Sequence, residues 1–527
     1  MEELPGRVGG VCILPEGPFP PNGINNAQGG EIYMKSRFYK AIPTLLAALA
    51  ALAALPQAQA NIAPRSDSAE PVGKIKPRLS SQIKSSKYGI GFECLDRKMY
   101  DPAPYYDIAA SLGVKHARCQ TGWARTETKK GQYDFKWLDD VVDNLRARGI
   151  QPWFNVGYGN PLYMSPTKNK YAVGHVPLYY GEECLRAWKN YVRALAEHFK
   201  GRVFEYEIWN EPNINTFWRD QEKDPAKYVE LIELTAREIK AADPNAKIGA
   251  ALAGGSSKYL TDMFKNGAGR ALDFISIHPY RIVPERGYEK MVRSIEKAIA
   301  ASGAKTRVRQ GETGFPYNIP ETCWVAKNTW HKGSEDIQAK WMLRQFLLDF
   351  TSGADLSSYF MITDFSPAYA LGKGAQVDTF AWGVTENGGN FRQRKVCQAM
   401  RNFLAVFDDS VRSAPATASI SFNHPRKAAV SRIPELAAQS AIKMFERNGL
   451  PMCVYYVPED LQLQSGALEN VSLSFNGTDF KKPVLIDFMD GGVYLLKSGA
   501  KNIPIADYPL MVAEFDAVAD LIEKNQK

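Results

Sequence analysis

The chain has 527 residues, of which 45% are hydrophobic and 23% are charged. This composition is typical of a globular protein and excludes a mostly disordered chain. The net charge of +8 is spread along the chain instead of being gathered in a basic cluster, so nucleic-acid binding is not predicted. At very roughly 150 residues per domain, the length allows two to four domains, or fewer if one is a large α/β barrel.

The N-terminal region contains three segments that we expect outside the main fold. Residues 1–33 are rich in Gly and Pro without periodicity and predict an unstructured upstream extension. Residues 34–60 have a basic start, an apolar stretch and the small-residue motif Ala58-Gln59-Ala60, which is the pattern of a secretory signal peptide. An alanine-rich soluble helix is the alternative. Residues 61–84 are polar, contain three prolines and predict a linker or an extended arm.

Cleavage after Ala60 would make the protein secreted or periplasmic. The apolar stretch, at about 14 residues, is short for a membrane span, so no span is expected after cleavage. The chain has seven cysteines, none in a CxxC pair or at metal-ligand spacing from a histidine, and a zinc site is therefore not predicted. The six cysteines after the N-terminal region could pair in an oxidising compartment, in an arrangement that the spacing leaves open.

Residues 85–410 alternate between short apolar runs and amphipathic helical patterns. The expected strands are residues 88–94, 114–119, 151–156, 204–209, 247–253, 273–277, 307–310 and 357–362, with helices after most of them. Eight such units predict an α/β fold, a (β/α)₈ TIM barrel. An open doubly wound sheet is the alternative, but it usually carries a GxGxxG loop, and residues 89–95 (GIGFECL) do not match it.

The pattern changes after the barrel, and residues 411–527 predict a C-terminal β-sandwich. Short strand-like runs occur at 452–457, 471–475, 484–488, 493–496 and 510–515. Asp490-Gly491-Gly492 supplies a hairpin turn between two of them. We expect this domain to support the barrel, with sugar binding as the less favoured alternative.

Two glutamates stand at the ends of predicted strands, Glu211 after the fourth and Glu312 after the seventh. Active residues of barrels lie at the carboxyl ends of the strands, so these side chains should face each other across a pocket. Hydrolysis of a glycosidic bond needs such a pair, with one carboxyl group protonated and the other ionised. The sequence therefore predicts that both glutamates are catalytic.

Three motifs carry a family resemblance over residues 85–410. Trp209-Asn210-Glu211-Pro212 resembles the acid/base motif of clan A glycoside hydrolases, the retaining "4/7" barrel superfamily. Gly311-Glu312-Thr313-Gly314 is similar to the nucleophile strand of that clan, and Ile277-His278-Pro279-Tyr280 to its His-x-Tyr element. With the C-terminal sandwich, the chain is most like family 39, which includes β-xylosidases, α-L-iduronidases and bacterial exopolysaccharide endoglycosidases.

The resemblance implies a role for each matching residue. Glu211 would be the general acid and later the general base, and Glu312 the nucleophile, kept ionised by Arg118 and Tyr280. Asn210 would bind the sugar 2-hydroxyl, His278 would contact a hydroxyl or a catalytic residue, and Trp382 would form an aromatic sugar platform. Asn155 and Glu93, also at strand ends, could bind hydroxyls, although Glu93 could equally be a buried structural carboxylate.

The predicted function is that of a secreted retaining glycoside hydrolase that cleaves a poly- or oligosaccharide by double displacement, without metal or organic cofactor. A carbohydrate-binding pseudoenzyme on the same barrel is one alternative, because a fold does not guarantee activity. A transglycosylase and an arabinofuranosidase of the same clan are two others. The pattern leaves the sugar, the linkage, endo or exo action and the oligomeric state open.

Overall fold

The computed structural model describes residues 69–167, 169–318, 333–365, 381–423, 440–458 and 466–524. Residues 1–68, and with them the predicted extension and signal peptide, lie outside this description. The eight predicted barrel strands are confirmed and close into one parallel barrel in chain order. They are β2 (Tyr88–Phe92), β3 (His116–Gln120), β4 (Gln151–Val156), β5 (Glu205–Ile208), β6 (Lys247–Ala253), β7 (Phe274–His278), β8 (Arg307–Thr313) and β9 (Ser357–Tyr359).

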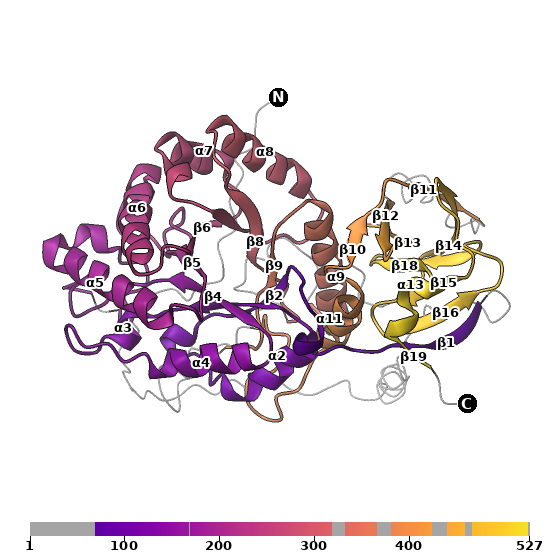
Figure 1. Cartoon of the computed structure of the whole chain (residues 1–527), viewed down its shortest axis with the longest axis horizontal. Coiled ribbons are helices and arrows are strands. Elements are labelled where there is room, and N and C mark those ends of the chain that lie inside the picture. The colour runs from indigo at the N-terminus through magenta and orange to yellow at the C-terminus, as the bar shows by residue number, and fades with distance from the viewer. Residues whose placement is uncertain are drawn as a thin grey trace, which may run out of the picture.

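Helices surround the barrel and cover its outer face (Figure 1). They are α2 (Tyr106–Leu112), α3 (Trp123–Thr126), α4 (Lys136–Ala147), α5 (Gly181–Phe199), α6 (Pro225–Ala242), α7 (Ser257–Lys265), α8 (Tyr288–Ala301), α9 (Glu335–Thr351) and α11 (Lys395–Val406). In α5 the buried positions recur three or four residues apart, as in Trp188, Tyr191 and Leu195, so one face packs on the strands. Helix α6 begins where the side chain of Asp224 accepts a hydrogen bond from Ala226 N and Pro225 occupies the first turn.

The C-terminal domain contains two antiparallel sheets, which agrees with the predicted β-sandwich. The larger has the order β10-β12-β13-β18-β15-β16-β1-β19, and the smaller β11-β14-β17. The bounds are β1 (Ala69–Ile75), β10 (Val411–Ser413), β11 (Thr417–Phe422), β12 (Ala441–Arg447), β13 (Leu450–Tyr456), β14 (Glu469–Asn476), β15 (Pro483–Asp487), β16 (Gly492–Leu496), β17 (Ile503–Ile505), β18 (Leu510–Glu514) and β19 (Ile522–Lys524), with a short helix α13 (Phe515–Val518). Gly491, between β15 and β16, has a φ of 79°, which suits the expected glycine turn.

Part of residues 61–84, the segment predicted as a linker or an extended arm, is a strand of the C-terminal domain. Residues Ala69–Ile75 form β1, which pairs with β16 on one side and β19 on the other. Figure 1 shows this indigo strand lying beside the yellow C-terminal strands. The domain is thus built from both ends of the chain. The polar and proline-containing sequence of this segment gave no strand signal, because the partners of β1 lie more than 400 residues away.

Helix α9 joins the two domains. Every residue from Ile337 to Asp349 in it is buried. The helix packs on β9 and α11 of the barrel, and Lys340 reaches Asp507 of the C-terminal domain. Lys340 forms an ion pair of 2.9 Å with Asp507, and Arg344 forms one of 2.5 Å with Glu285, which also accepts a hydrogen bond from Tyr456. The two domains are therefore held by buried charge pairs as well as apolar contacts.

The cysteines that the structure describes, Cys94, Cys119, Cys184, Cys397 and Cys453, are buried free thiols. The disulfides considered from the sequence do not form among these five. In the described parts of the chain, no helix combines the length and apolarity needed to cross a bilayer.

Candidate active site

The backbone after β5 has an unusual conformation that aims Glu211 into the barrel mouth. Trp209 and Glu211 both have positive φ angles, 62° and 43°, which non-glycine residues rarely adopt. Neighbouring strands hold this turn: Trp209 N donates to Val156 O at 2.9 Å, and Glu211 N donates to Ala251 O at 3.2 Å. Such strained positions cluster at functional sites because the surrounding structure must maintain them.

Glu312 lies in an irregular part of β8. The pairing of β8 with β9 shifts register between Gln310 and Thr313, so β8 contains one residue more than its partner over this stretch. An irregularity of this kind redirects side chains relative to the regular alternation of a strand. Glu312 follows directly on Gly311, where an added Cβ would lie 1.7 Å from the Ser276 hydroxyl oxygen, so any larger residue there would require Ser276 to move.

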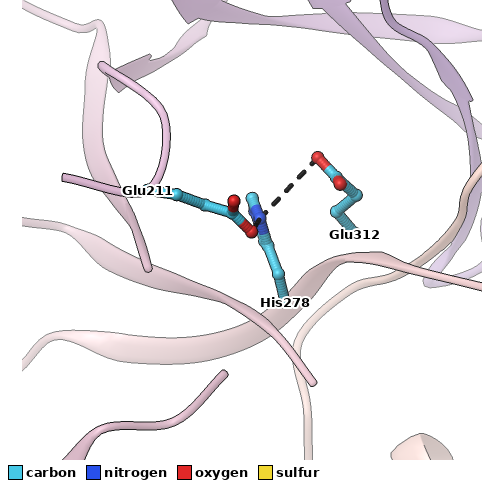
Figure 2. A group of neighbouring side chains, drawn as sticks. All are labelled: Glu211, His278 and Glu312. Carbon is cyan, nitrogen blue, oxygen red and sulfur yellow. Dashed lines mark hydrogen bonds and ion pairs between the residues drawn. The ribbon is translucent and has the colours of Figure 1, made fainter. Parts of the chain in front are cut away.

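The two glutamates meet at His278, which ends β7 (Figure 2). A hydrogen bond of 2.8 Å joins His278 Nδ1 to Glu211 Oε1, and the same nitrogen lies 3.7 Å from Glu312 Oε2. One ligand-type atom from each of the three residues lies within 4.8 Å of the others. Strands four, six and seven of the barrel thus bring their ends together, as the sequence predicted for the two glutamates.

Arg118, in β3, is the fully buried cation of this site. Its Nη1 donates to Glu312 Oε2 at 2.5 Å, and its Nη2 donates to Asn210 Oδ1 at 2.8 Å. Its Nε and Nη2 both donate to Glu207 Oε1, the former at 3.0 Å. The guanidinium therefore connects the end of β5 to the end of β8 and fixes both relative to β3.

The pKa of Glu211 lies well above its ordinary value. Burial is the main cause because it disfavours the charged form, and the negative charge of Glu312 adds to it. Glu211 is 1% exposed, and its Oε2 has no hydrogen-bond partner among the described residues. Of Glu211 and Glu312, Glu211 is therefore the one that retains a proton.

Burial also raises the pKa of Glu312, but two donors oppose the effect. The Arg118 charge lowers it most, followed by the hydrogen bond from Tyr280, whose hydroxyl donates to Glu312 Oε1 at 2.7 Å. Both oxygens of Glu312 thus accept a hydrogen bond, whereas Glu211 has one partner. In this coupled pair Glu312 is the first to ionise.

His278 is neutral in this environment. Burial and the nearby Arg118 charge hold its pKa well below the ordinary value. Its Nε2 is buried without a partner among the described residues. A neutral imidazole that touches both carboxyl groups positions them without adding a charge.

Asn210 and Asn155 are both buried but contact different partners. Asn210 uses Oδ1 to accept from Arg118, which leaves its amide group for another partner. Asn155 is completely buried and donates to Glu207 Oε1 at 2.9 Å and to the Trp209 carbonyl at 2.7 Å. This geometry favours a supporting role for Asn155 over the direct sugar contact that the sequence suggested.

Aromatic side chains line one side of the site. Trp382 packs edge-on against Tyr280, with ring centroids 5.2 Å apart, and also contacts Phe360 at 6.2 Å. The Tyr280 ring is thereby held where its hydroxyl reaches Glu312. Trp382 is 3% exposed.

Glu207 is a site residue that sequence reasoning missed. It is fully buried in β5, accepts hydrogen bonds from Arg118 and Asn155, and leaves Oε2 without a partner among the described residues. A signal was present in the strand: Glu205 and Glu207 are two residues apart, so regular alternation places both on one face of a strand predicted to be buried.

Glu211, His278 and Glu312 are also the residues best placed to hold a metal ion in the described chain. Carboxylate and imidazole ligands suit a divalent cation. Arg118 and Tyr280 already occupy both oxygens of Glu312, and the positive Arg118 charge opposes a second cation. The arrangement suits chemistry in which one carboxyl group supplies a proton and the other supplies an electron pair.

Comparisons with known proteins find glycoside hydrolases. Residues 111–331 match the model of glycosyl hydrolases family 39. A β-xylosidase of Geobacillus stearothermophilus is 33% identical over 161 residues, which are 28% of this chain and 31% of the relative. A β-xylosidase of Caldicellulosiruptor saccharolyticus is 27% identical over 206 residues, 36% of this chain and 40% of the relative. The chain thus spans less than half the length of these curated relatives.

A solved structure shares the architecture of the described chain. The family 39 glycoside hydrolase from the gut symbiont Bacteroides cellulosilyticus WH2 superposes with a TM-score of 0.59 at 16% identity, covering 81% of this chain and 80% of the other. At this identity the likeness shows the fold. The family match over residues 111–331 separately supports the resemblance to a clan A, family 39-like enzyme that the sequence motifs indicated.

Proposed function

We propose that the protein is an exported, retaining glycoside hydrolase, with Glu211 as acid/base and Glu312 as nucleophile. One observation carries the proposal: carboxylate oxygens of the two residues lie within 4.8 Å of each other at the ends of β5 and β8. Retaining enzymes hold their carboxyl groups about 5–5.5 Å apart, whereas inverting enzymes need about 6.5–9.5 Å to admit a water molecule. The unequal pKa values of the pair support the assignment of roles.

In the first step Glu312 attacks the anomeric carbon while Glu211 gives its proton to the leaving oxygen. The glycosidic C–O bond breaks, and an ester bond forms between the sugar and Glu312. Arg118 and Tyr280 keep Glu312 ionised beforehand through their hydrogen bonds of 2.5 and 2.7 Å. The Asn210 amide group is oriented by Arg118 and is free to bind a sugar hydroxyl.

In the second step Glu211 acts as a base. Once Glu312 is esterified, its negative charge no longer raises the pKa of Glu211, so that Glu211 ionises more readily. It then takes a proton from water, which attacks the anomeric carbon and releases Glu312 as a carboxylate. Transfer to a second sugar in place of water would make the protein a transglycosylase.

The substrates to test first are β-xylosides, because both relatives described above are named β-xylosidases. The assay is reducing-end release from aryl glycosides and a broad polysaccharide panel, with proton NMR to follow the anomer first released. The proposal expects product with retained configuration and loss of release in Glu312→Gln. The matched control is Glu230→Gln, which changes an exposed glutamate of α6 that pairs with Lys227.

Each other outcome of this assay has a definite meaning. Inverted product would overturn the roles given to the glutamates. Release that persists undiminished in Glu312→Gln would exclude it as nucleophile. A purified, folded wild type that binds oligosaccharides but releases nothing would be the carbohydrate-binding alternative.

Export is the second part of the proposal and rests on the sequence of residues 34–60. Expression of the full chain in a bacterial host, followed by cell fractionation and N-terminal sequencing, tests it. We expect a processed protein that begins at Asn61 and lies outside the cytoplasm. A product that keeps residues 34–60 in the cytoplasmic fraction would contradict it.

A further inference from the structure

A third buried carboxyl group, that of Glu93, faces the nucleophile and has no place in the mechanism above. Glu93 directly follows β2 and is 1% exposed. Its Oε1 lies 3.5 Å from Arg118 Nη1, the same nitrogen that donates to Glu312 Oε2 at 2.5 Å. Both oxygens of Glu93 are buried, and neither has a hydrogen-bond partner among the described residues. A carboxylate here would be costly, because it would have no hydrogen bond and would share its counter-ion, Arg118, with Glu207 and Glu312.

The strand itself makes room for this carboxyl group. A Cβ added to Gly91 would lie 1.8 Å from Glu93 Oε2. Gly91 in β2 thus allows the Glu93 side chain to fold back beside its own strand, toward Arg118 in β3. The placement results from a specific residue two positions earlier and does not depend on a surface loop.

The groups that face Glu93 come from four places around the barrel mouth. They are Arg118 and Cys119 in β3, Glu312 in β8, Tyr280 after β7, and Cys94 and Tyr100 after β2. Burial raises the pKa of both thiols and both phenols, so all four are neutral at physiological pH. Arg118 is therefore the one cation in this set, and it already serves Glu207 and Glu312.

We propose that Glu93 is a positioning residue of the active site that acts in its neutral form. A neutral Glu93 does not compete with the nucleophile, Glu312, for the hydrogen bond from Arg118. While Glu93 holds its proton, the Nη1 group of Arg118 is committed to Glu312. When Glu93 loses the proton, a second carboxylate competes for the same nitrogen and adds a negative charge beside Glu312. The glutamate thus limits activity on the alkaline side.

The electrostatics agree with this geometry. Burial and the Glu312 charge raise the pKa of Glu93 to about 8, although Arg118 opposes the effect. The group is then protonated through the neutral range and ionises just above it. The effect on activity rests on the proposed glycosidase function, whereas the protonation state of Glu93 does not.

The stability of Glu93→Gln tests the protonation state without any substrate. A pKa raised in the folded state contributes stability that is fully present below the unfolded pKa and lost as pH rises through the folded pKa. Glutamine cannot ionise, so the variant does not lose stability in this way as pH rises. The melting temperature of the variant, relative to wild type, should therefore rise by several degrees from about pH 5 to about pH 9.

The matched control is Glu205→Gln. Glu205 forms an ion pair with Arg309, and the charge of Arg309 is the main cause of its lowered pKa. A lowered pKa contributes stability above the unfolded value, so this variant should lose stability relative to wild type as pH rises through the acidic range. The two substitutions should thus respond to pH in opposite directions. If Glu93→Gln responds to pH as Glu205→Gln does, the proposal that Glu93 is neutral in the folded protein is wrong.

The pH profile of kcat/KM tests the connection to the nucleophile. The alkaline limb should move to higher pH in Glu93→Gln, because the ionisation that removes Arg118 from Glu312 is gone. An unmoved limb, together with the expected stability result, would show a neutral Glu93 that does not act on Glu312 and would overturn the positioning role. An inactive wild type would instead count against the proposed function, while the stability comparison would still decide the state of Glu93.

If Glu93→Gln does not fold, Glu93 is titrated in the Glu211→Gln variant instead. That variant lacks the other glutamate whose pKa is strongly raised. Carbon-13 NMR of labelled glutamate carboxyl groups should then show one midpoint near pH 8. A titration series without a midpoint in this region would overturn the proposal.

Discussion

Two buried arginines, Arg118 and Arg309, face the interior of the same barrel. Both pair with carboxylate side chains, but the surroundings of the two pairs differ. Arg309 donates to Glu205 at 2.6 Å and to Asp355 at 3.2 Å, and its guanidinium packs on the Phe274 ring. Arg118 contacts Glu207 and Glu312, and lies 3.5 Å from Glu93. Strand β5 supplies a carboxylate to each arginine, Glu205 at its first residue and Glu207 two residues on.

The difference lies in charge balance and water. The side chains of Glu205 and Asp355 are 25% and 17% exposed, and the pKa of Glu205 is lowered, as in an ordinary ion pair. Around Arg118 the carboxyl groups are almost completely buried and outnumber the cation, so burial raises the pKa of Glu93, Glu211 and Glu312. The same residue types therefore make an ordinary ion pair at the amino ends of the strands and the proposed active site at the carboxyl ends.

The largest effect should come from Glu312→Gln, compared with Glu205→Gln. We expect kcat of the former to fall on the order of 10⁴-fold or more, because the covalent step is lost. The latter should stay close to wild-type activity and lose only stability. Rates on the best aryl glycoside, with circular dichroism to verify folding, provide the check. Similar losses in both variants would contradict the division into reactive and structural clusters.

Arg118→Met and Arg309→Met should differ nearly as clearly. Removing one partner of a buried ion pair costs about 3–5 kcal/mol, and we expect Arg118→Met to show this loss in the free energy of unfolding. It should also lose about 10²–10³-fold in kcat, the scale of a missing preorganised donor. Arg309→Met should be less destabilised, because water reaches its carboxylates, and should keep its activity. Denaturant unfolding and steady-state kinetics measure both.

Tyr280→Phe should move the acidic limb of the pH profile upward. The variant lacks the hydrogen bond that stabilises ionised Glu312. A hydrogen bond to a charged group contributes about 1.5–3 kcal/mol, so its loss should raise the pKa of Glu312 further. Because Glu312 must be ionised to attack, activity at low pH falls. The dependence of kcat/KM on pH measures this, and an unchanged limb would mean that Tyr280 does not stabilise the charged form.

Glu207→Gln should produce a smaller shift in the opposite direction. The Glu207 charge raises the pKa of both Glu312 and Glu211, so its removal lowers both. The acidic limb of the pH profile, which the ionisation of Glu312 sets, should therefore move to lower pH. Glutamine can still accept from Arg118, and so the positions of the site residues are kept. A shift to higher pH would show that Glu207 acts by holding Arg118 in place instead of by its charge.

Much of the barrel could be predicted because its signals are local. Each buried strand is a short apolar run, so a strand such as Gln151–Val156 was predicted with the same bounds that the structure shows. The positions of Glu211 and Glu312 at strand ends were equally evident, since barrel strands all point their carboxyl ends to one face. Their catalytic roles remain predictions for the experiments above.

Other features needed contacts between distant parts of the chain. The sequence by itself determined the eight-strand barrel, the C-terminal sheets and the two strand-end glutamates, because hydrophobic periodicity and turn residues act over a few positions. Only the tertiary structure decided that β1 completes the C-terminal sheet, that the register shift in β8 redirects Glu312, and that Arg118 is shared among Glu207, Glu312 and Glu93. Strand pairing and buried charge depend on which segments pack together, and no local pattern encodes a partner 100 or 400 residues away.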